Sequence, residues 1–203
     1  KCCIYADNRI FYIKFLIKLI EFFVSNDLIK NEDKEIYEYA ANIILSSLIH
    51  IATVMILGLC FNLFIESLVF YFSFIAIRKF AGGYHAKTPV RCYAFSVISS
   101  IIVLCLIKLS NSVGNIFTYL LIIFELLCVV LIILMSPLDT ENNPLNSYEK
   151  KWYKTLAVLI SVCIFIISLF CVLTELRNIW YSLICGVIMS TLVLLMRKVQ
   201  ITN

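Results

Sequence analysis

A histidine and a cysteine lie close together in a polar, glycine-containing stretch between long hydrophobic runs. They are His85 and Cys92, within residues 78–92, which read RKFAGGYHAKTPVRC. A cysteine thiolate can attack a carbonyl carbon, and a nearby histidine can take the thiol proton and later protonate a leaving amine. The pair therefore predicts nucleophilic chemistry of the cysteine-peptidase type.

The neighbouring residues indicate how this pair would be presented. Gly82 and Gly83 break the preceding helix and permit backbone conformations that are closed to other residues. Thr88 and Pro89 are typical of a helix start, because Thr can cap and Pro suits the first helical position. We therefore expect Cys92 in or just after the first turn of a helix. The free N–H groups there favour a thiolate and could form an oxyanion hole.

Spacing alone leaves other interpretations of these residues open. His85 could bond backbone in a loop, and Cys92 could be a small packing residue. Zinc needs three or four protein ligands, and the other histidine, His50, lies inside a hydrophobic run. We therefore expect neither a metal nor another cofactor. His50 is interpreted as a hydrogen-bonded residue of a helix bundle rather than as a catalyst.

The composition indicates that the elements positioning the pair lie in a membrane. The chain has 203 residues, of which 62% are hydrophobic and 15% are charged, whereas an ordinary soluble domain is about 45–50% apolar. Lipid must therefore cover much of the surface, and we expect it as a partner. The net charge of +4 forms no basic stripe with interleaved aromatics, so no nucleic-acid partner is expected.

The hydrophobic runs predict an all-α, polytopic membrane protein that forms a single domain over residues 1–203. A spanning helix needs about 20 residues. Six segments qualify or nearly so, at roughly 40–60, 63–77, 93–109, 116–135, 155–173 and 178–196. Little more than Phe61-Asn62 separates the first two, which demands a tight helical hairpin. A four-span arrangement with this pair re-entrant stays open.

Charged residues predict the orientation of these spans. With six spans and a cytoplasmic N-terminus, 15 of the 17 Lys and Arg residues fall inside, and Lys108 and Arg177 fall outside. The positive-inside rule favours this arrangement, which makes both termini and residues 78–92 cytoplasmic. Within the N-terminal segment 1–35, residues 9–24 predict an amphipathic helix in the membrane interface or on the cytoplasmic face of the protein.

The pattern R-x-x-x-G-G-x-H-A-x-x-x-x-x-C over residues 78–92 resembles the signature of the AgrB family, the membrane endopeptidases of Gram-positive peptide quorum sensing. The loop SPLDTENNPL at 136–145 resembles the loop between the middle spans of that family. The resemblance covers essentially the whole chain. It implies that Cys92 is the nucleophile and His85 the general base, with Arg78 and Gly83 at supporting positions.

The same resemblance implies a substrate and a cellular location. The substrate would be an AgrD-type propeptide with an amphipathic leader and an acidic C-terminal tail. The enzyme would remove the tail and help to close a thiolactone or lactone ring. The setting would be the cell membrane of a Gram-positive bacterium, with the active site on the cytoplasmic side and a homodimer as the assembly.

Further residues could help to bind the substrate or to orient the catalytic pair. Asn42 falls where relatives usually carry Glu or Gln, and an amide there could orient a substrate or a catalytic group. Asp139 in the 136–145 loop could orient His85, or it could simply be solvated. Four cations could hold the acidic tail by charge, or they could serve only as topology signals. These are Arg78, Lys79, Lys87 and Arg91.

Two other classes of function compete with the peptidase. A non-catalytic peptide transporter or exporter would line a path with polar residues inside the spans, since intramembrane carboxylates are costly and hint at function or pairing. Its path would use His50, Asn62, Glu66 and Glu125. A non-enzymatic membrane scaffold of a signalling system is the third class.

Overall fold

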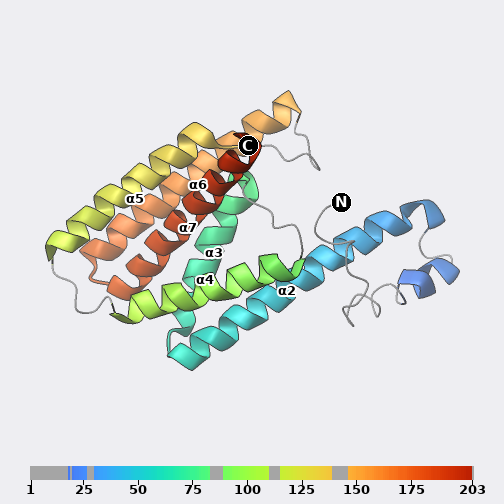
Figure 1. Cartoon of the computed structure of the whole chain (residues 1–203), viewed down its shortest axis with the longest axis horizontal. Coiled ribbons are helices and arrows are strands. Elements are labelled where there is room, and N and C mark those ends of the chain that lie inside the picture. Colours follow the sequence, from blue (N-terminus) through green and yellow to red (C-terminus); the bar gives the residue numbers. More distant parts are fainter. Residues whose placement is uncertain are drawn as a thin grey trace. The chain divides into compact units, whose positions relative to one another are not determined.

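The computed structural model describes residues 18, 20–26, 30–82, 89–109, 115–138 and 146–202. Within these ranges every regular element is a helix (Figure 1). Residues 20–25 are helical. The later elements are η1 (Asn31–Asp33), α2 (Lys34–Phe61), α3 (Phe64–Ala81), α4 (Pro89–Leu109), α5 (Asn115–Met135), α6 (Ser147–Leu173) and α7 (Arg177–Thr202). The all-α prediction is confirmed.

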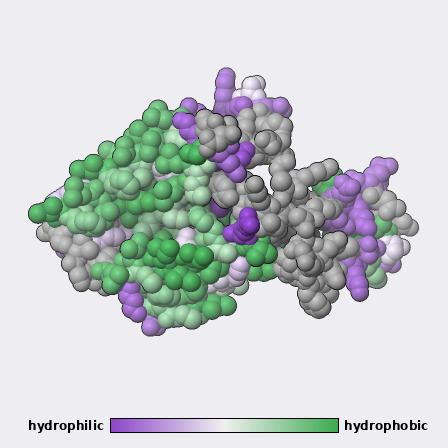
Figure 2. All heavy atoms as spheres, in the orientation of Figure 1, coloured by the Kyte–Doolittle hydropathy of each residue, from purple (hydrophilic) through white to green (hydrophobic). Residues whose placement is uncertain are grey.

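Five helices in this described part are long and apolar enough to cross a membrane: α2, α4, α5, α6 and α7. Their surfaces carry many large hydrophobic side chains, such as Ile116 and Leu173, which are 80% and 82% exposed. On the face shown in Figure 2, hydrophobic atoms cover much of the region where Figure 1 places α4 and α5. Water would not tolerate so much exposed hydrocarbon, so these helices indicate a membrane protein.

Helix α3 is the segment on which the six-span count depends. It has 18 residues and carries Glu66, Arg78 and Lys79. At its rise per residue it is about 27 Å long, a little short of the hydrocarbon core of a bilayer. Six spans, the cytoplasmic termini and the interfacial N-terminal helix stay predictions.

A tight turn joins α2 to α3 at the position where the sequence predicts the hairpin. Asn62 has a φ of 57°, a left-handed conformation that Asn tolerates better than most residues. The N–H of Leu63 donates to the carbonyl of Gly58 at 2.8 Å, and that of Asn62 donates to the carbonyl of Leu59 at 3.1 Å. This pair of bonds is a Schellman motif, which ends α2.

The chain divides into two compact units. One holds the described residues up to Thr53 together with residues 89–96, which include Cys92. The other holds residues 54–82 and the described residues from Val97 onward. The prediction of a single domain over 1–203 stays a prediction.

Helix α7 lies at the centre of the second unit. Of its segment Arg177–Gln200, 61% is buried, against 11–28% for the other candidate spans. It packs closely on α3, because a Cβ on Gly186 would collide with Ser73. The Ser190 hydroxyl donates to the carbonyl of Gly186 in its own helix at 2.8 Å and lies 3.3 Å from the carbonyl oxygen of Phe74 in α3. Small residues thus let α3 and α7 approach closely, as helices commonly do in membranes.

Both carboxylates that the sequence places inside apolar runs have partners on other helices. Ser168 of α6 donates to Glu125 Oε2 of α5 at 2.7 Å, and Glu125 is fully buried. Among the described residues, its other oxygen, Oε1, has no hydrogen-bond partner. The Asn178 amide of α7 lies 3.4 Å from Glu66 Oε1 of α3. These pairs join helices of the bundle.

Replacing Ser168 with alanine is expected to destabilise the protein by about 1–3 kcal/mol, because a buried acceptor loses its donor. Thermal or denaturant unfolding in detergent would measure this loss. The control is Ser161→Ala on the same helix. Ser161 is equally buried, but its hydroxyl donates to its own helix, at the carbonyl of Ala157. Equal losses in the two variants would contradict a specific role for the bond between helices.

Candidate active site

Cys92 lies in the first turn of α4. The helix begins at Pro89, as predicted, and Cys92 is half-buried with a free thiol. Because the first N–H groups of a helix have no partner within the helix, this position offers donors and partial positive charge. The hydroxyl of Ser96, one turn later on α4, donates to the Cys92 carbonyl at 3.2 Å.

Gly82 ends α3 and starts the segment that leads to His85. Its φ and ψ are 81° and −169°, a region that is essentially restricted to glycine. Its N–H donates to the Arg78 carbonyl at 3.1 Å, and the N–H of Leu138 donates to the Ala81 carbonyl at 3.1 Å. A Cβ at Gly82 would lie 2.7 Å from the Leu138 oxygen. The predicted helix break is confirmed at Gly82. The end of α3 is hydrogen-bonded to the segment after α5.

Gly82→Ala is therefore expected to strain the backbone by about 1–3 kcal/mol and to push Leu138 away. If the segment after Gly82 carries the general base, turnover on a propeptide substrate should fall more than the loss of folded protein explains. Unfolding and turnover should be measured on one preparation. A variant that matches the wild type in both would contradict this account of Gly82.

The structure describes only some of the other predicted site residues. Arg78 lies in the last turn of α3, and its guanidinium carbon is 5.5 Å from the centre of the Phe74 ring, which is a cation–π distance. Lys79 and Arg91 are exposed. Asn42 lies within α2, but its side chain is outside the described part. Also outside the described residues are Gly83, His85, Lys87, Thr88 and Asp139.

Comparison with known proteins decides the family. The model of the family described as Accessory gene regulator B matches residues 16–194. This range contains His85, Cys92 and all of α2 to α6. The chain belongs to the AgrB family. The resemblance stated from residues 78–92 is therefore confirmed, and membership supports a role in accessory gene regulator autoinducer processing.

Individual AgrB relatives agree with this membership. An AgrB-like protein of Clostridium perfringens strain SM101 is 32% identical over 184 residues, covering 88% of this chain and 85% of the relative. A second, from strain 13, is 35% identical and covers 68% and 67%. The accessory gene regulator protein B of Staphylococcus aureus strain MRSA252 is 34% identical and covers 54% and 56%. No solved structure matches.

A polar cluster that the sequence did not predict lies next to Cys92 in this AgrB chain. The Tyr93 hydroxyl lies 2.8 Å from Thr53 Oγ1, and the Tyr93 and His50 ring centroids are 5.1 Å apart. His50 thus contacts α4, in keeping with its interpretation as a bundle residue. The three-residue spacing of His50 and Thr53 indicates that they share a helical face. It does not indicate that this face contacts Tyr93.

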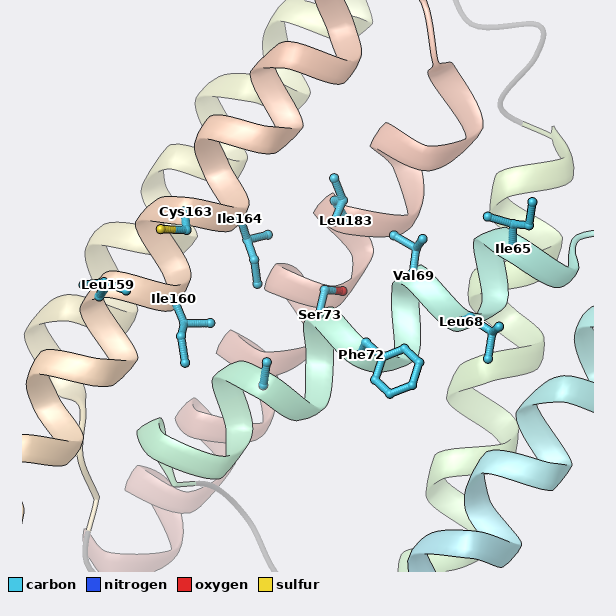
Figure 3. Close-up of a pocket in the computed structure, with 11 residues that line it drawn as sticks. Ile65, Leu68, Val69, Phe72, Ser73, Leu159, Ile160, Cys163, Ile164 and Leu183 are labelled. Carbon is cyan, nitrogen blue, oxygen red and sulfur yellow. The ribbon is translucent and has the colours of Figure 1, made fainter.

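A groove of about 480 Å³ lies between α3 and α6 (Figure 3). Its described lining is hydrocarbon apart from Ser73 and Cys163, and the Ser73 hydroxyl donates to the carbonyl of Phe70. The side chains shown in Figure 3 include Leu68, Val69, Phe72, Ile160, Ile164 and Leu183. This lining offers no base to activate the Cys163 thiol, so the groove is not the candidate active site.

Proposed function

We propose that this AgrB chain is a membrane cysteine endopeptidase that removes the C-terminal tail of an AgrD-type propeptide. The observation that carries the proposal is the position of Cys92 in the first turn of α4, seven residues after His85. The N–H donors and positive potential at a helix N-terminus would stabilise the oxyanion that develops when this thiol attacks a carbonyl.

The first half of the reaction breaks the peptide bond before the tail. His85 accepts the Cys92 proton while Sγ attacks the carbonyl carbon, and a tetrahedral oxyanion forms. When the C–N bond breaks, His85 returns the proton to the leaving amine. The tail departs, and the remaining propeptide is held on Cys92 as a thioester.

The second half closes the ring. A thiol of the propeptide loses its proton and attacks the thioester carbonyl, and Cys92 leaves as a thiolate that regains a proton. One thioester replaces another, so the exchange is close to balanced in energy, and a propeptide hydroxyl would give a lactone by the same path. Water has to be kept from the acyl-enzyme, which apolar helices at a membrane boundary would favour.

Supporting residues are proposed for the substrate. The cations Arg78, Lys79, Lys87 and Arg91 would attract the acidic tail, and Asn42 would orient the substrate or a catalytic group. Gly83 would extend the break that starts at Gly82. The enzyme would act as a homodimer in the cell membrane of a Gram-positive bacterium, with residues 78–92 on the cytoplasmic side.

Reconstitution tests the proposal. The full chain in lipid vesicles is mixed with a synthetic propeptide of AgrD type, and products are identified by mass spectrometry. We expect a free acidic tail and a ring-closed peptide whose mass is lower than that of the propeptide by the mass of the released tail. An unchanged propeptide that is merely moved across the vesicle membrane would contradict the proposal and support the exporter.

A further inference from the structure

Three side chains connect α2 to the first turns of α4, within the compact unit that contains Cys92. Thr53 and His50 lie three residues apart on α2, so they share a face of that helix. Tyr93 of α4 contacts both, with its hydroxyl 2.8 Å from Thr53 Oγ1 and its ring tilted by 56° to that of His50. Tyr93 directly follows Cys92 in the sequence.

The direction of the hydrogen bond follows from the other bond that Thr53 makes. The Thr53 hydroxyl lies 2.8 Å from the carbonyl oxygen of Ile49, which can only accept. A hydroxyl has one proton and two lone pairs, so the Thr53 proton is committed to Ile49. Tyr93 therefore donates to Thr53, and α2 offers Tyr93 a fixed acceptor.

Tyr93 directly follows the first turn of α4, which runs from Pro89 to Cys92. The first turn of a helix lacks the carbonyl partners that would hold its N–H groups, so side-chain contacts contribute more to fixing it. Neighbouring residues on a helix point about 100° apart. Holding Tyr93 against α2 thus sets the direction in which the Cys92 side chain leaves the helix.

We propose that Tyr93 is a positioning residue for the proposed peptidase, held by Thr53 and His50, and that it aims Cys92 Sγ at the scissile carbonyl. The inference rests on the proposed function. A misplacement of about 1 Å at a reacting atom can cost on the order of 10²-fold in rate. Loss of one anchoring hydrogen bond should lower the rate by less than this, because the ring contact with His50 remains.

A double-mutant cycle tests the hydrogen bond. Tyr93→Phe, Thr53→Val and the double variant are reconstituted in vesicles, and kcat and KM for tail release are measured per folded protein. We expect each single variant to lower kcat by about 3- to 10-fold with KM unchanged. The double variant should be no worse than either single one, because both remove the same bond.

Two matched controls and one rescue sharpen this test. Tyr119→Phe removes an exposed tyrosine hydroxyl on α5. Thr155→Val removes a hydroxyl on α6 that bonds its own helix at the carbonyl of Lys151, as Thr53 does at Ile49. Both should leave kcat unchanged. His50→Ala should lower kcat, and His50→Phe, which keeps a ring against Tyr93, should restore it.

Several results would overturn the inference. The single variants could have the kcat of the wild type, or the losses of kcat could add in the double variant. A higher KM at unchanged kcat would mean that Tyr93 binds substrate instead. Cys92→Ala is assayed in parallel. If Cys92→Ala is inactive while Tyr93→Phe is normal, only the positioning role fails. If Cys92→Ala still releases the tail, the proposed function itself fails.

Discussion

Cys92→Ala is expected to reduce tail release by at least about 10³-fold, because covalent attack has no substitute once the thiol is gone. The protein should still fold and insert, since Cys92 is only half-buried and alanine suits a helix. Mass spectrometry of the released tail, with enzyme in vesicles, would measure the loss.

The chain offers a matched control on the same helix. Cys105 also lies on α4 and carries a free, exposed thiol, but it lies inside the apolar run, far along the helix from its N-terminus. Cys105→Ala should retain full activity. Tail release by Cys92→Ala at the wild-type rate would show that the nucleophile has been assigned wrongly.

His85→Ala is expected to lower the rate of tail release by about 10²- to 10⁴-fold, which is the usual contribution of a general acid–base group. A free imidazole in the buffer should restore part of the lost rate, because it can occupy the space of the deleted ring and carry the proton. It should restore nothing to Cys92→Ala. Rates with and without imidazole at fixed pH would be compared in both variants.

The second histidine of the chain provides the control for this experiment. His50 packs against Tyr93, so its substitution by Phe should keep the rate and should not respond to imidazole. A His85→Ala enzyme with wild-type activity would leave Cys92 without a base in this account, and a different proton acceptor would then have to be sought.

Local features of the fold could be predicted from the sequence because neighbouring residues determine them. Pro89 starts α4, Gly82 ends α3 with a positive φ, and Asn62 turns α2 into α3. Each depends on the backbone preference of one residue type. The placement of Cys92 in the first turn of α4 followed from Pro89 in the same way.

Helix boundaries were predicted less well, because hydropathy marks the apolar part of a helix and not its polar ends. The predicted segment 155–173 is the later part of α6, which begins at Ser147. The segment 63–77 likewise stops short of Ala81, where α3 ends. Arg and Lys are good helix formers and are favoured near a helix C-terminus, so Arg78 and Lys79 extend the helix beyond the apolar run.

Contacts between distant segments could not be predicted from one sequence. Ser168 lies 43 residues from its partner Glu125, and Thr53 lies 40 residues from Tyr93. Residue spacing gives the face of a helix but not the helix that meets it. The partners of the two carboxylates in apolar runs, and the contact beside Cys92, therefore could not be predicted.

Trapping the acyl-enzyme tests directly whether Cys92 is the nucleophile. The enzyme is incubated in vesicles with a propeptide whose ring-closing thiol is replaced by a methyl group, so that the thioester cannot be passed on. It is then quenched in acid and digested. We expect the peptide containing Cys92 to gain the mass of the tail-less propeptide less one water, and to lose this mass on treatment with hydroxylamine. Tail release without any adduct at Cys92, or with the adduct on another residue, would contradict this expectation.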